Sequence, residues 1–460
     1  MLLRAAILAA FFLAAFWFRP FPLAFKQSVP YYAGFLIVVP AGAAIGLWLL
    51  LGMPGLRAAL RDGRRWWIGL ALSLTFWAVL SPVWSRYPAV SMDSAQQFAV
   101  VMAFALVVLC AGPSPRAAAA ALAAGLIISA AVIIGQFYAQ GSLGLAALGE
   151  FTLSPERRAI SVVAAGPVRL LRPYGLSVHP NVAAGCLVAA LLALSGWLAD
   201  RDTTIWRWIV RAGVGLLGVW AVWLTFSRSA WAALAGGALL VGAAWLRRGV
   251  ARPARGRVAL ALGGVALTAG LFVAAYPDLV LARAGAGGEE VELISVEARR
   301  IFIDIAFQIA PRRPITGAGI GAFAWEARDV LAGSPLRTLI RAENVHSTPL
   351  LALTELGIVG FGLWAGTLLI GFGLAWRRAR DPFAAGLAAG AAALIAISVI
   401  DHYPWTMFPV GLLLWGSLAL AIGSAPANDP NDAQEQAEGE GGRVQGQGDA
   451  QGQVRAVGDG

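Results

Sequence analysis

The chain has 460 residues, of which 59% are hydrophobic and 13% are charged, and its formal net charge is +10. Soluble domains carry about 25% charged residues, so this composition excludes an ordinary soluble protein and predicts an integral membrane protein. Nearly all of the positive charge is arginine, scattered between apolar runs with no basic domain, so no nucleic-acid partner is expected.

The apolar runs are continuous, which favours membrane helices of ~20 residues over the alternating segments of a transmembrane barrel. We therefore predict an all-α, polytopic fold with about twelve spans. The first run is interpreted as a retained span, because no convincing signal-peptide cleavage site follows it. The predicted spans are residues 3–18, 31–51, 66–82, 97–112, 117–137, 180–199, 206–226, 229–246, 257–276, 347–375, 383–400 and 404–423.

Arginines cluster in the loops after the second, eighth and tenth spans. Short cytoplasmic loops are enriched in arginine, so both termini are predicted to be cytoplasmic. The long loops 138–179 and 277–346 then face the periplasm, and the second is expected to contain short helices, since residues 296–309 show helical periodicity. On this periplasmic side, at membrane boundaries, lie all three histidines: His179, His346 and His402.

Two regions are expected by composition. Residues 1–423 form one transmembrane domain. Residues 424–460 are rich in Gly, Gln, Asp and Glu and poor in large apolar side chains, which predicts a disordered cytoplasmic tail.

His346 is the first candidate for chemistry, because it ends the long polar loop just before the chain re-enters the membrane. A neutral imidazole there can accept the proton of an attacking hydroxyl group or position that group. The alternative is an interfacial histidine without a catalytic role.

Arginines supply the candidate anion site, because a guanidinium binds phosphate in a forked geometry. Arg228 lies in a tight turn between two spans, where an ionisable group is costly and usually functional; an interfacial anchor beside Trp231 is the alternative. Arg172 precedes His179 and Asn181 at the start of the sixth span. These last two residues either contact substrate or cap that helix.

Arg299 and Arg300 stand near the start of the helical segment 296–309. The following segment, 314–323, contains glycines that would let backbone amides approach a phosphate. Without a preceding strand this pattern is weak, and a tight connector is favoured. The periplasmic carboxylates show no D-x-D or H-x-x-x-H spacing, so no metal site and no cofactor are predicted.

In this order, these segments resemble the O-antigen ligase and polymerase superfamily, and most of all the O-antigen ligases. The resemblance covers about residues 70–410. Two positions depart from the family pattern. Ser347 follows the histidine where Asn is common, and Ile303 stands where an aromatic residue is usual after the helix arginine, so the choice between Arg299 and Arg300 stays open. The matching segments are Leu80-Ser81-Pro82-Val83-Trp84-Ser85, Arg172-Pro173-Tyr174-Gly175-Leu176, His179-Pro180-Asn181, Ser227-Arg228-Ser229-Ala230, the helix from Arg299 to Pro314-x-x-Gly317-x-Gly319, and His346 ahead of Glu355-x-Gly357.

The resemblance implies a metal-independent, inverting glycosyltransferase of the bacterial inner membrane, with its active site facing the periplasm. The donor would be a glycan on undecaprenyl pyrophosphate, the acceptor lipid A-core or another glycan, and membrane lipid would surround the site. The resemblance implies catalytic roles for His346, Arg228 and Arg299. It implies substrate-binding roles for Arg172, Arg300, His179, Asn181 and Asn344.

Other functions remain open at this point. A polysaccharide polymerase or a protein O-oligosaccharyltransferase of the same superfamily would use the same residues with another acceptor. A transporter or flippase would place polar groups in the middle of the membrane and show internal repeats. The sequence instead collects its polar groups at one face.

Overall fold

The computed structural model describes residues 1–18, 37–157, 160–200, 204–247, 252–285, 290–334, 341–378 and 381–424. These residues all belong to one compact unit, Met1–Ser424. The tail expected at 424–460 lies outside the described residues, apart from Ser424.

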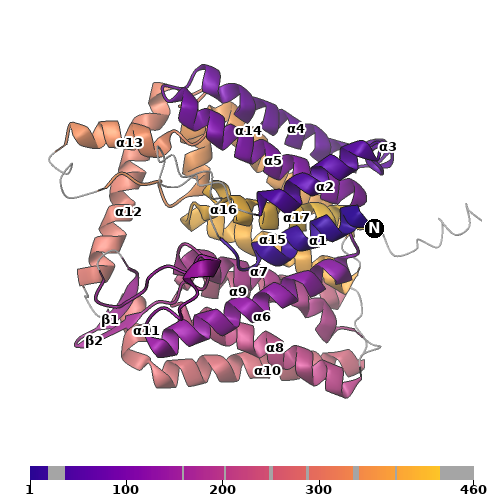
Figure 1. The fold of residues 1–460 in the computed structure, drawn as a ribbon, viewed down its shortest axis with the longest axis vertical. Coiled ribbons are helices and arrows are strands. Elements are labelled where there is room, and N and C mark those ends of the chain that lie inside the picture. Colours follow the sequence, from indigo (N-terminus) through magenta and orange to yellow (C-terminus); the bar gives the residue numbers. More distant parts are fainter. Residues whose placement is uncertain are drawn as a thin grey trace, which may run out of the picture. The chain divides into compact units, whose positions relative to one another are not determined.

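The regular secondary structure of the described residues is almost entirely helical (Figure 1). The exception is a hairpin of two antiparallel strands, β1 (Val162–Ala165) and β2 (Val168–Leu171). The helices are α1 (Leu2–Ala14), α2 (Val38–Leu50), α3 (Leu56–Arg61), α4 (Arg64–Leu80), α5 (Pro88–Ala111), α6 (Pro115–Ala139), α7 (Pro180–Leu198), α8 (Ile205–Leu224), α9 (Arg228–Arg247), α10 (Arg252–Ala275), α11 (Pro277–Arg283), α12 (Glu290–Ile309), α13 (Phe323–Ala332), α14 (Thr348–Arg378), α15 (Pro382–Ile400), α16 (Tyr403–Thr406) and α17 (Phe408–Gly423), with short 3-10 turns at Ser81–Val83, Ala146–Leu148 and Ala310–Arg312.

The prediction of an all-α polytopic membrane protein is confirmed. Within the described ranges, nine helices are long and apolar enough to cross a membrane. Three shorter apolar helices, Leu2–Ala14, Val38–Leu50 and Phe408–Gly423, occupy the positions of the other expected spans. The β hairpin in loop 138–179 was not predicted, because its strands of four residues are too short to show a clear alternation.

Proline and polar caps set where many of these helices begin. Pro suits the first turn of a helix because its missing N–H would have no partner there. Pro115 begins α6 and Pro382 begins α15, and each follows a polar cap. The Ser114 hydroxyl accepts the Ala117 amide at 3.3 Å, and the Asp381 carboxylate accepts the Ala384 amide at 2.9 Å.

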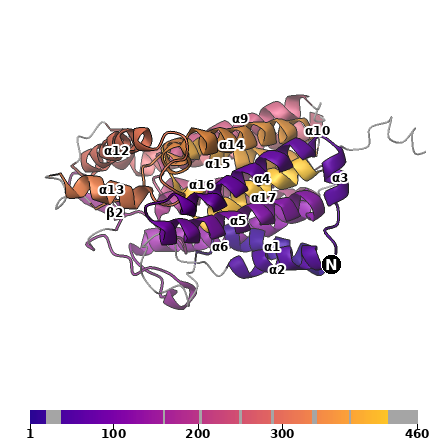
Figure 2. The same cartoon turned by 90° about the horizontal axis from the view of Figure 1, so that it is seen from above.

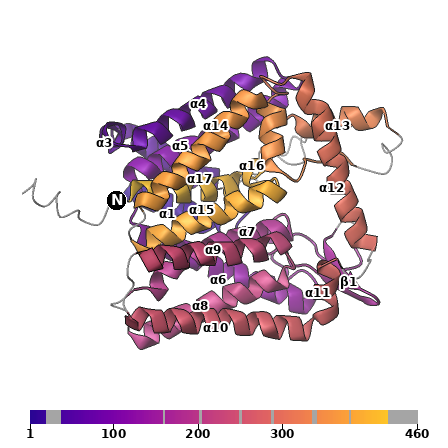
Figure 3. The same ribbon diagram turned by 180° about the vertical axis from the view of Figure 1, so that it is seen from behind.

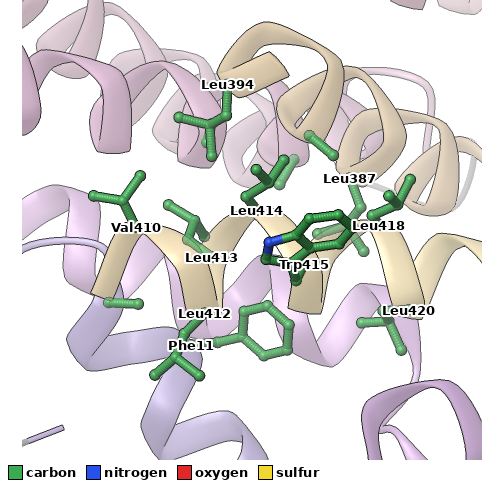
Figure 4. Packing of buried hydrophobic residues seen from close by; sticks show 14 of the residues in the cluster. Phe11, Leu387, Leu394, Val410, Leu412, Leu413, Leu414, Trp415, Leu418 and Leu420 are labelled. Carbon is green, nitrogen blue, oxygen red and sulfur yellow. The ribbon is translucent and has the colours of Figure 1, made fainter. Parts of the chain in front are cut away.

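The centre of the bundle is formed by α7, α15 and α17. Helices in a membrane pack closely through small residues, and a Cβ atom at Gly390 of α15 would lie 2.8 Å from the Ala189 carbonyl oxygen of α7. Figure 4 shows Trp415 of α17 packed among apolar side chains, with Phe11 of α1 and Leu387 of α15 nearby.

The outer side of the bundle is formed in part by α8 and α10, which lie side by side in Figures 1 and 3. Only 6% of the spanning window of α10 is buried inside the protein. Its large apolar side chains, such as Leu260 and Leu271, are therefore available to lipid.

The long loop 277–346 forms α11, α12 and α13, and Figure 2 shows α12 and α13 together at one end of the bundle. Phe302 and Ile305 on the apolar face of α12 pack against Phe323 of α13 and Val345. The helical periodicity predicted at 296–309 is thus confirmed. The same packing fixes the segment that leads directly into His346.

Candidate functional site

His346 faces a buried carboxylate from another part of the chain. Its Nδ1 atom lies 3.3 Å from Oδ1 of Asp401, which directly follows α15. Asp401 is 4% exposed and also accepts the His402 backbone amide at 2.8 Å. Burial opposes ionisation of Asp401, but the hydrogen bond from His346 and the neighbouring His402 hold its pKa below the usual range. A carboxylate on Nδ1 favours the tautomer whose Nε2 lone pair accepts a proton.

A chain of buried polar groups joins this pair to Arg172. The Arg172 Nη2 atom donates to Oδ1 of Asn181 at 2.6 Å, and the Asn181 Nδ2 atom donates to Oδ2 of Asp401 at 3.3 Å. Arg172 and Asn181 are 5% and 7% exposed. The structure therefore brings His346 to Arg172 and Asn181, which lie in a distant segment of the sequence, and Asp401 connects His346 to Asn181.

His179 caps α7. Its Nδ1 atom accepts the Asn181 amide at 3.1 Å, which leaves Nε2 as the donor to the Ser161 hydroxyl at 3.0 Å. Burial, followed by the charge of Arg172, lowers the pKa of His179 to about 3, so the ring is neutral. The capping interpretation of His179 is confirmed, and its contact with substrate stays a prediction.

Three arginines converge on the turn that joins α8 to α9. The Arg172 Nε atom donates to the Thr225 carbonyl oxygen at 2.8 Å, and the Arg283 Nε atom donates to the Phe226 carbonyl oxygen at 3.1 Å. Arg228 donates from Nη1 to the Arg283 carbonyl oxygen at 2.7 Å. Phe226 has φ +52°, a left-handed conformation that costs free energy in a residue other than glycine and that occurs in tight turns and at functional sites.

Arg283 was missed by the sequence analysis, in which it is one of many arginines beside a polar loop. In the structure it is 8% exposed, at the end of α11, against the Arg228 turn. The sequence does indicate a short helix that begins at Pro277 and ends at Arg283. It does not indicate which neighbouring element buries Arg283.

Arg299 and Arg300 differ in their surroundings. Arg299 is half-buried, whereas Arg300 is exposed. Burial lowers the pKa of His402 to about 4 against the opposing effect of Asp401, and the positive charge of Arg299 contributes to the lowering. Its partial burial and its electrostatic effect on His402 favour Arg299 over Arg300 as the helix arginine of the site.

Asn344 is 2% exposed, and within the described part of the chain neither atom of its amide has a hydrogen-bond partner. Buried amides without partners are uncommon and often mark a functional site or an ordered water. Its predicted contact with substrate stays a prediction.

The glycines before α13 form a tight connector. The Ala318 and Gly319 amides donate to the Thr354 and Glu355 carbonyl oxygens at 2.9 and 2.8 Å. A Cβ atom at Gly317, where φ is +70°, would lie 2.3 Å from the carbonyl carbon of Glu355. These amides are already used inside the protein, so the connector interpretation holds and the phosphate interpretation does not.

His346, Asp401 and His402 also form a group that could hold a metal ion, with donor atoms within 4.8 Å of one another. Imidazole nitrogens and a carboxylate oxygen are ligands that Zn²⁺ accepts. Sequence spacing could not reveal this group, because 55 positions separate His346 from Asp401. The expectation of a metal-free site therefore needs a direct test.

Comparison with known proteins concerns the middle of the chain. Residues 212–365 match the family model described as O-antigen ligase. The matched segment contains Arg228, Arg299 and His346, while Arg172 and Asp401 lie outside it. None of the curated proteins compared with the chain matches it. The family match agrees with the resemblance seen in the motifs and supports the O-antigen ligase superfamily.

Proposed function

We propose that this protein transfers a glycan from undecaprenyl pyrophosphate to an acceptor hydroxyl group, and specifically O-antigen to lipid A-core. The reaction takes place at the periplasmic face of the bacterial inner membrane. One observation carries the proposal: the His346–Asp401 pair lies where the apolar helices α14 and α15 begin and end, and it is joined through Asn181 to Arg172, which in turn contacts the turn of Arg228. This arrangement combines a proton acceptor with groups that bind an anionic leaving group.

In this reaction the acceptor oxygen attacks the anomeric carbon of the donor sugar, and the bond from that carbon to the pyrophosphate oxygen breaks. Nε2 of His346 takes the hydroxyl proton, and undecaprenyl pyrophosphate leaves with the bonding electron pair. Attack on the face opposite the leaving group inverts the anomeric carbon. The Asp401 carboxylate stabilises the imidazolium that forms, as the carboxylate does in a catalytic triad.

The arginines supply positive charge to the pyrophosphate. Each guanidinium has five N–H donors in a rigid fork that fits phosphate oxygens. Arg228 and Arg299 would stabilise the charge that grows on the leaving group, and Arg172 would orient it. Arg300, His179, Asn181 and Asn344 complete the proposed binding site.

A reconstituted reaction tests the proposal. Purified protein in proteoliposomes is given an undecaprenyl-pyrophosphate-linked O-antigen and lipid A-core, and products are separated by electrophoresis. We expect glycosylated lipid A-core and one released undecaprenyl pyrophosphate for each glycan transferred. Glycan consumed with lipid A-core unchanged would contradict the proposed acceptor.

Asp401→Asn is expected to lower the transfer rate by roughly 10²-fold, because an amide cannot stabilise the imidazolium by charge. The measurement is the transfer rate in proteoliposomes that contain equal amounts of inserted protein. Asp62→Asn is the matched control, since Asp62 also pairs with arginines but lies beside Arg64 and Arg378, away from His346. If Asp401→Asn transferred glycan as fast as Asp62→Asn, the role given to the carboxylate would be wrong.

EDTA is expected to leave the transfer rate unchanged, because arginines neutralise the pyrophosphate and Asp401 already holds Nδ1 of His346. The check is the rate after dialysis against EDTA, together with the metal content of the purified protein. Inhibition that is reversed by added Zn²⁺ would instead assign His346, Asp401 and His402 to a metal site.

A further inference from the structure

His402 lies beside His346 but has no part in the transfer reaction proposed above. The centroids of the two imidazole rings are 5.1 Å apart. One buried carboxylate oxygen contacts both residues: Oδ1 of Asp401 lies 3.3 Å from Nδ1 of His346 and accepts the backbone amide of His402 at 2.8 Å. The shared carboxylate therefore holds the two histidines at a fixed spacing.

The turn that carries His402 is fixed to α14. The backbone amide of Trp405 donates to the His402 carbonyl oxygen at 2.9 Å. The indole Nε1–H of Trp405 donates at 3.0 Å to the carboxylate of Glu355, which is 0% exposed. The Thr348 hydroxyl donates to the Asp401 carbonyl oxygen at 3.1 Å. Such support is what a precise binding group requires, so His402 is preorganised in the way expected of a residue that contacts substrate.

Thr406 sets the tautomer of His402. Its hydroxyl group donates to the His402 carbonyl oxygen at 3.2 Å, so it accepts the N–H of His402 Nδ1, which lies 2.8 Å away. In a neutral imidazole one ring nitrogen is a donor and the other is an acceptor. Nε2 of the neutral His402 ring therefore carries a lone pair.

This lone pair is open to a ligand. His402 is partly exposed. Within the described part of the chain, its Nε2 atom has no hydrogen-bond partner, and it is not one of the unpaired atoms that the protein encloses completely. The side chain of His346 is 24% exposed, and its Nε2 atom is open in the same sense. The two neighbouring rings therefore each offer an acceptor nitrogen to a ligand.

Two adjacent acceptor nitrogens favour a ligand with two adjacent donors. Phosphate oxygens are acceptors, so the pyrophosphate of the donor does not suit these lone pairs, whereas hydroxyl groups do. A sugar carries hydroxyl groups on neighbouring carbon atoms. The spacing of the two rings allows one such pair to reach both histidines, with one hydroxyl group at each ring.

We propose that His402 binds the acceptor sugar through the hydroxyl group next to the one that attacks. Nε2 of His402 accepts a hydrogen bond from this second hydroxyl group, while His346 acts on the attacking one. The inference rests on the proposed function and adds a requirement to it: the acceptor carries two hydroxyl groups on neighbouring carbon atoms. His402 then determines which acceptors are used without itself taking a proton.

The test is the transfer assay in proteoliposomes with lipid A-core whose acceptor sugar is intact or lacks one hydroxyl group at a time. Wild type should give no product when the attacking hydroxyl group is missing. When a neighbouring one is missing, kcat/KM should fall roughly tenfold, the effect of one hydrogen bond. A structural role for His402 would leave the ratio of kcat/KM between the two acceptors unchanged in its variants, so this ratio is the deciding measurement.

Two substitutions separate the ring nitrogens of His402. His402→Asn places an amide where Nδ1 contacts Thr406 but has no atom at the position of Nε2. We expect it to be roughly tenfold slower with the intact acceptor and no slower when the neighbouring hydroxyl group is missing. His402→Gln places an amide oxygen near the position of Nε2, so it should restore discrimination between the two acceptors. His402→Phe repeats the test if His402→Asn does not fold.

Tyr403→Phe is the matched control. It lies in the same turn and removes a buried hydroxyl group that has no hydrogen-bond partner among the residues that the structure describes. It should keep both the rate and the discrimination of wild type.

Four results would overturn the inference. The first is a neighbouring hydroxyl group whose removal affects wild type and His402→Asn equally, or neither of them. The second is a loss in His402→Asn that depends on a hydroxyl group of the donor sugar. The third is zinc bound by wild type but not by His402→Asn, which would assign Nε2 to a metal ion. The fourth is no transfer by wild type to intact lipid A-core, which would overturn the proposed function as well.

Discussion

His346→Ala is expected to lower glycan transfer by roughly 10²- to 10⁴-fold, the usual contribution of a positioned general base. The substitution removes the nitrogen that takes the acceptor proton. Folding should survive, because the His346 side chain is 24% exposed and Asp401 keeps its contacts with Asn181 and the His402 amide. Transfer is measured in proteoliposomes at equal protein content, and folding by size-exclusion chromatography.

His346→Gln separates a base from a positioning group. The glutamine amide can hydrogen-bond an acceptor hydroxyl group but cannot take its proton at neutral pH. If His346 acts as the base, both variants lose activity to the same extent. Activity close to wild type in His346→Gln would reduce His346 to a positioning role, and wild-type activity in His346→Ala would remove it from the site.

Arg228→Lys is expected to lower transfer by roughly 10- to 100-fold, because a hydrogen bond to a charged group contributes about 1.5–3 kcal/mol and lysine cannot bind phosphate in a forked geometry. Arg228→Ala is expected to lower the transfer rate further than Arg228→Lys does. Arg247→Lys is the control, since Arg247 lies at the opposite end of the same helix, where it faces the Trp376 ring.

The loss in Arg228→Lys has two possible origins, phosphate binding and the shape of the turn. Arg228 also donates to the Arg283 carbonyl oxygen, so its replacement can disturb the conformation at Phe226. A lower transfer rate with unchanged thermal stability indicates lost phosphate binding, whereas lower stability indicates a disturbed turn. A rate equal to that of Arg247→Lys would make Arg228 an anchor without a catalytic role.

Hydropathy and arginine distribution could predict most of the fold, because a span must be apolar along its whole length and its loops must carry the charge. The amphipathic helix at 296–309 could also be predicted, because the helical spacing of its apolar residues is visible within one short segment of the sequence. The β hairpin at 162–171 was not predicted, because its strands are too short to show a clear alternation of apolar and polar residues.

The sequence could predict several residues of the candidate site, but it could not predict which of them contact one another. His346, Arg172 and Asn181 stood out as polar groups at membrane boundaries, whereas the pairing of His346 with Asp401 depends on how α15 packs beside the end of the long loop. Arg283 shows the same limit, because its burial depends on contacts between elements distant in sequence. Contacts between distant elements produce no residue spacing that can be recognised in the sequence.

The most direct test is deletion of the gene in its host, with lipopolysaccharide separated on a gel after complementation by wild type or by His346→Ala. We expect only core bands in the deletion strain, accumulation of polymeric glycan on the lipid carrier, and a ladder restored by wild type alone. Single-repeat bands on core would instead identify a polymerase, and an unchanged ladder in the deletion strain would contradict transfer to lipid A-core.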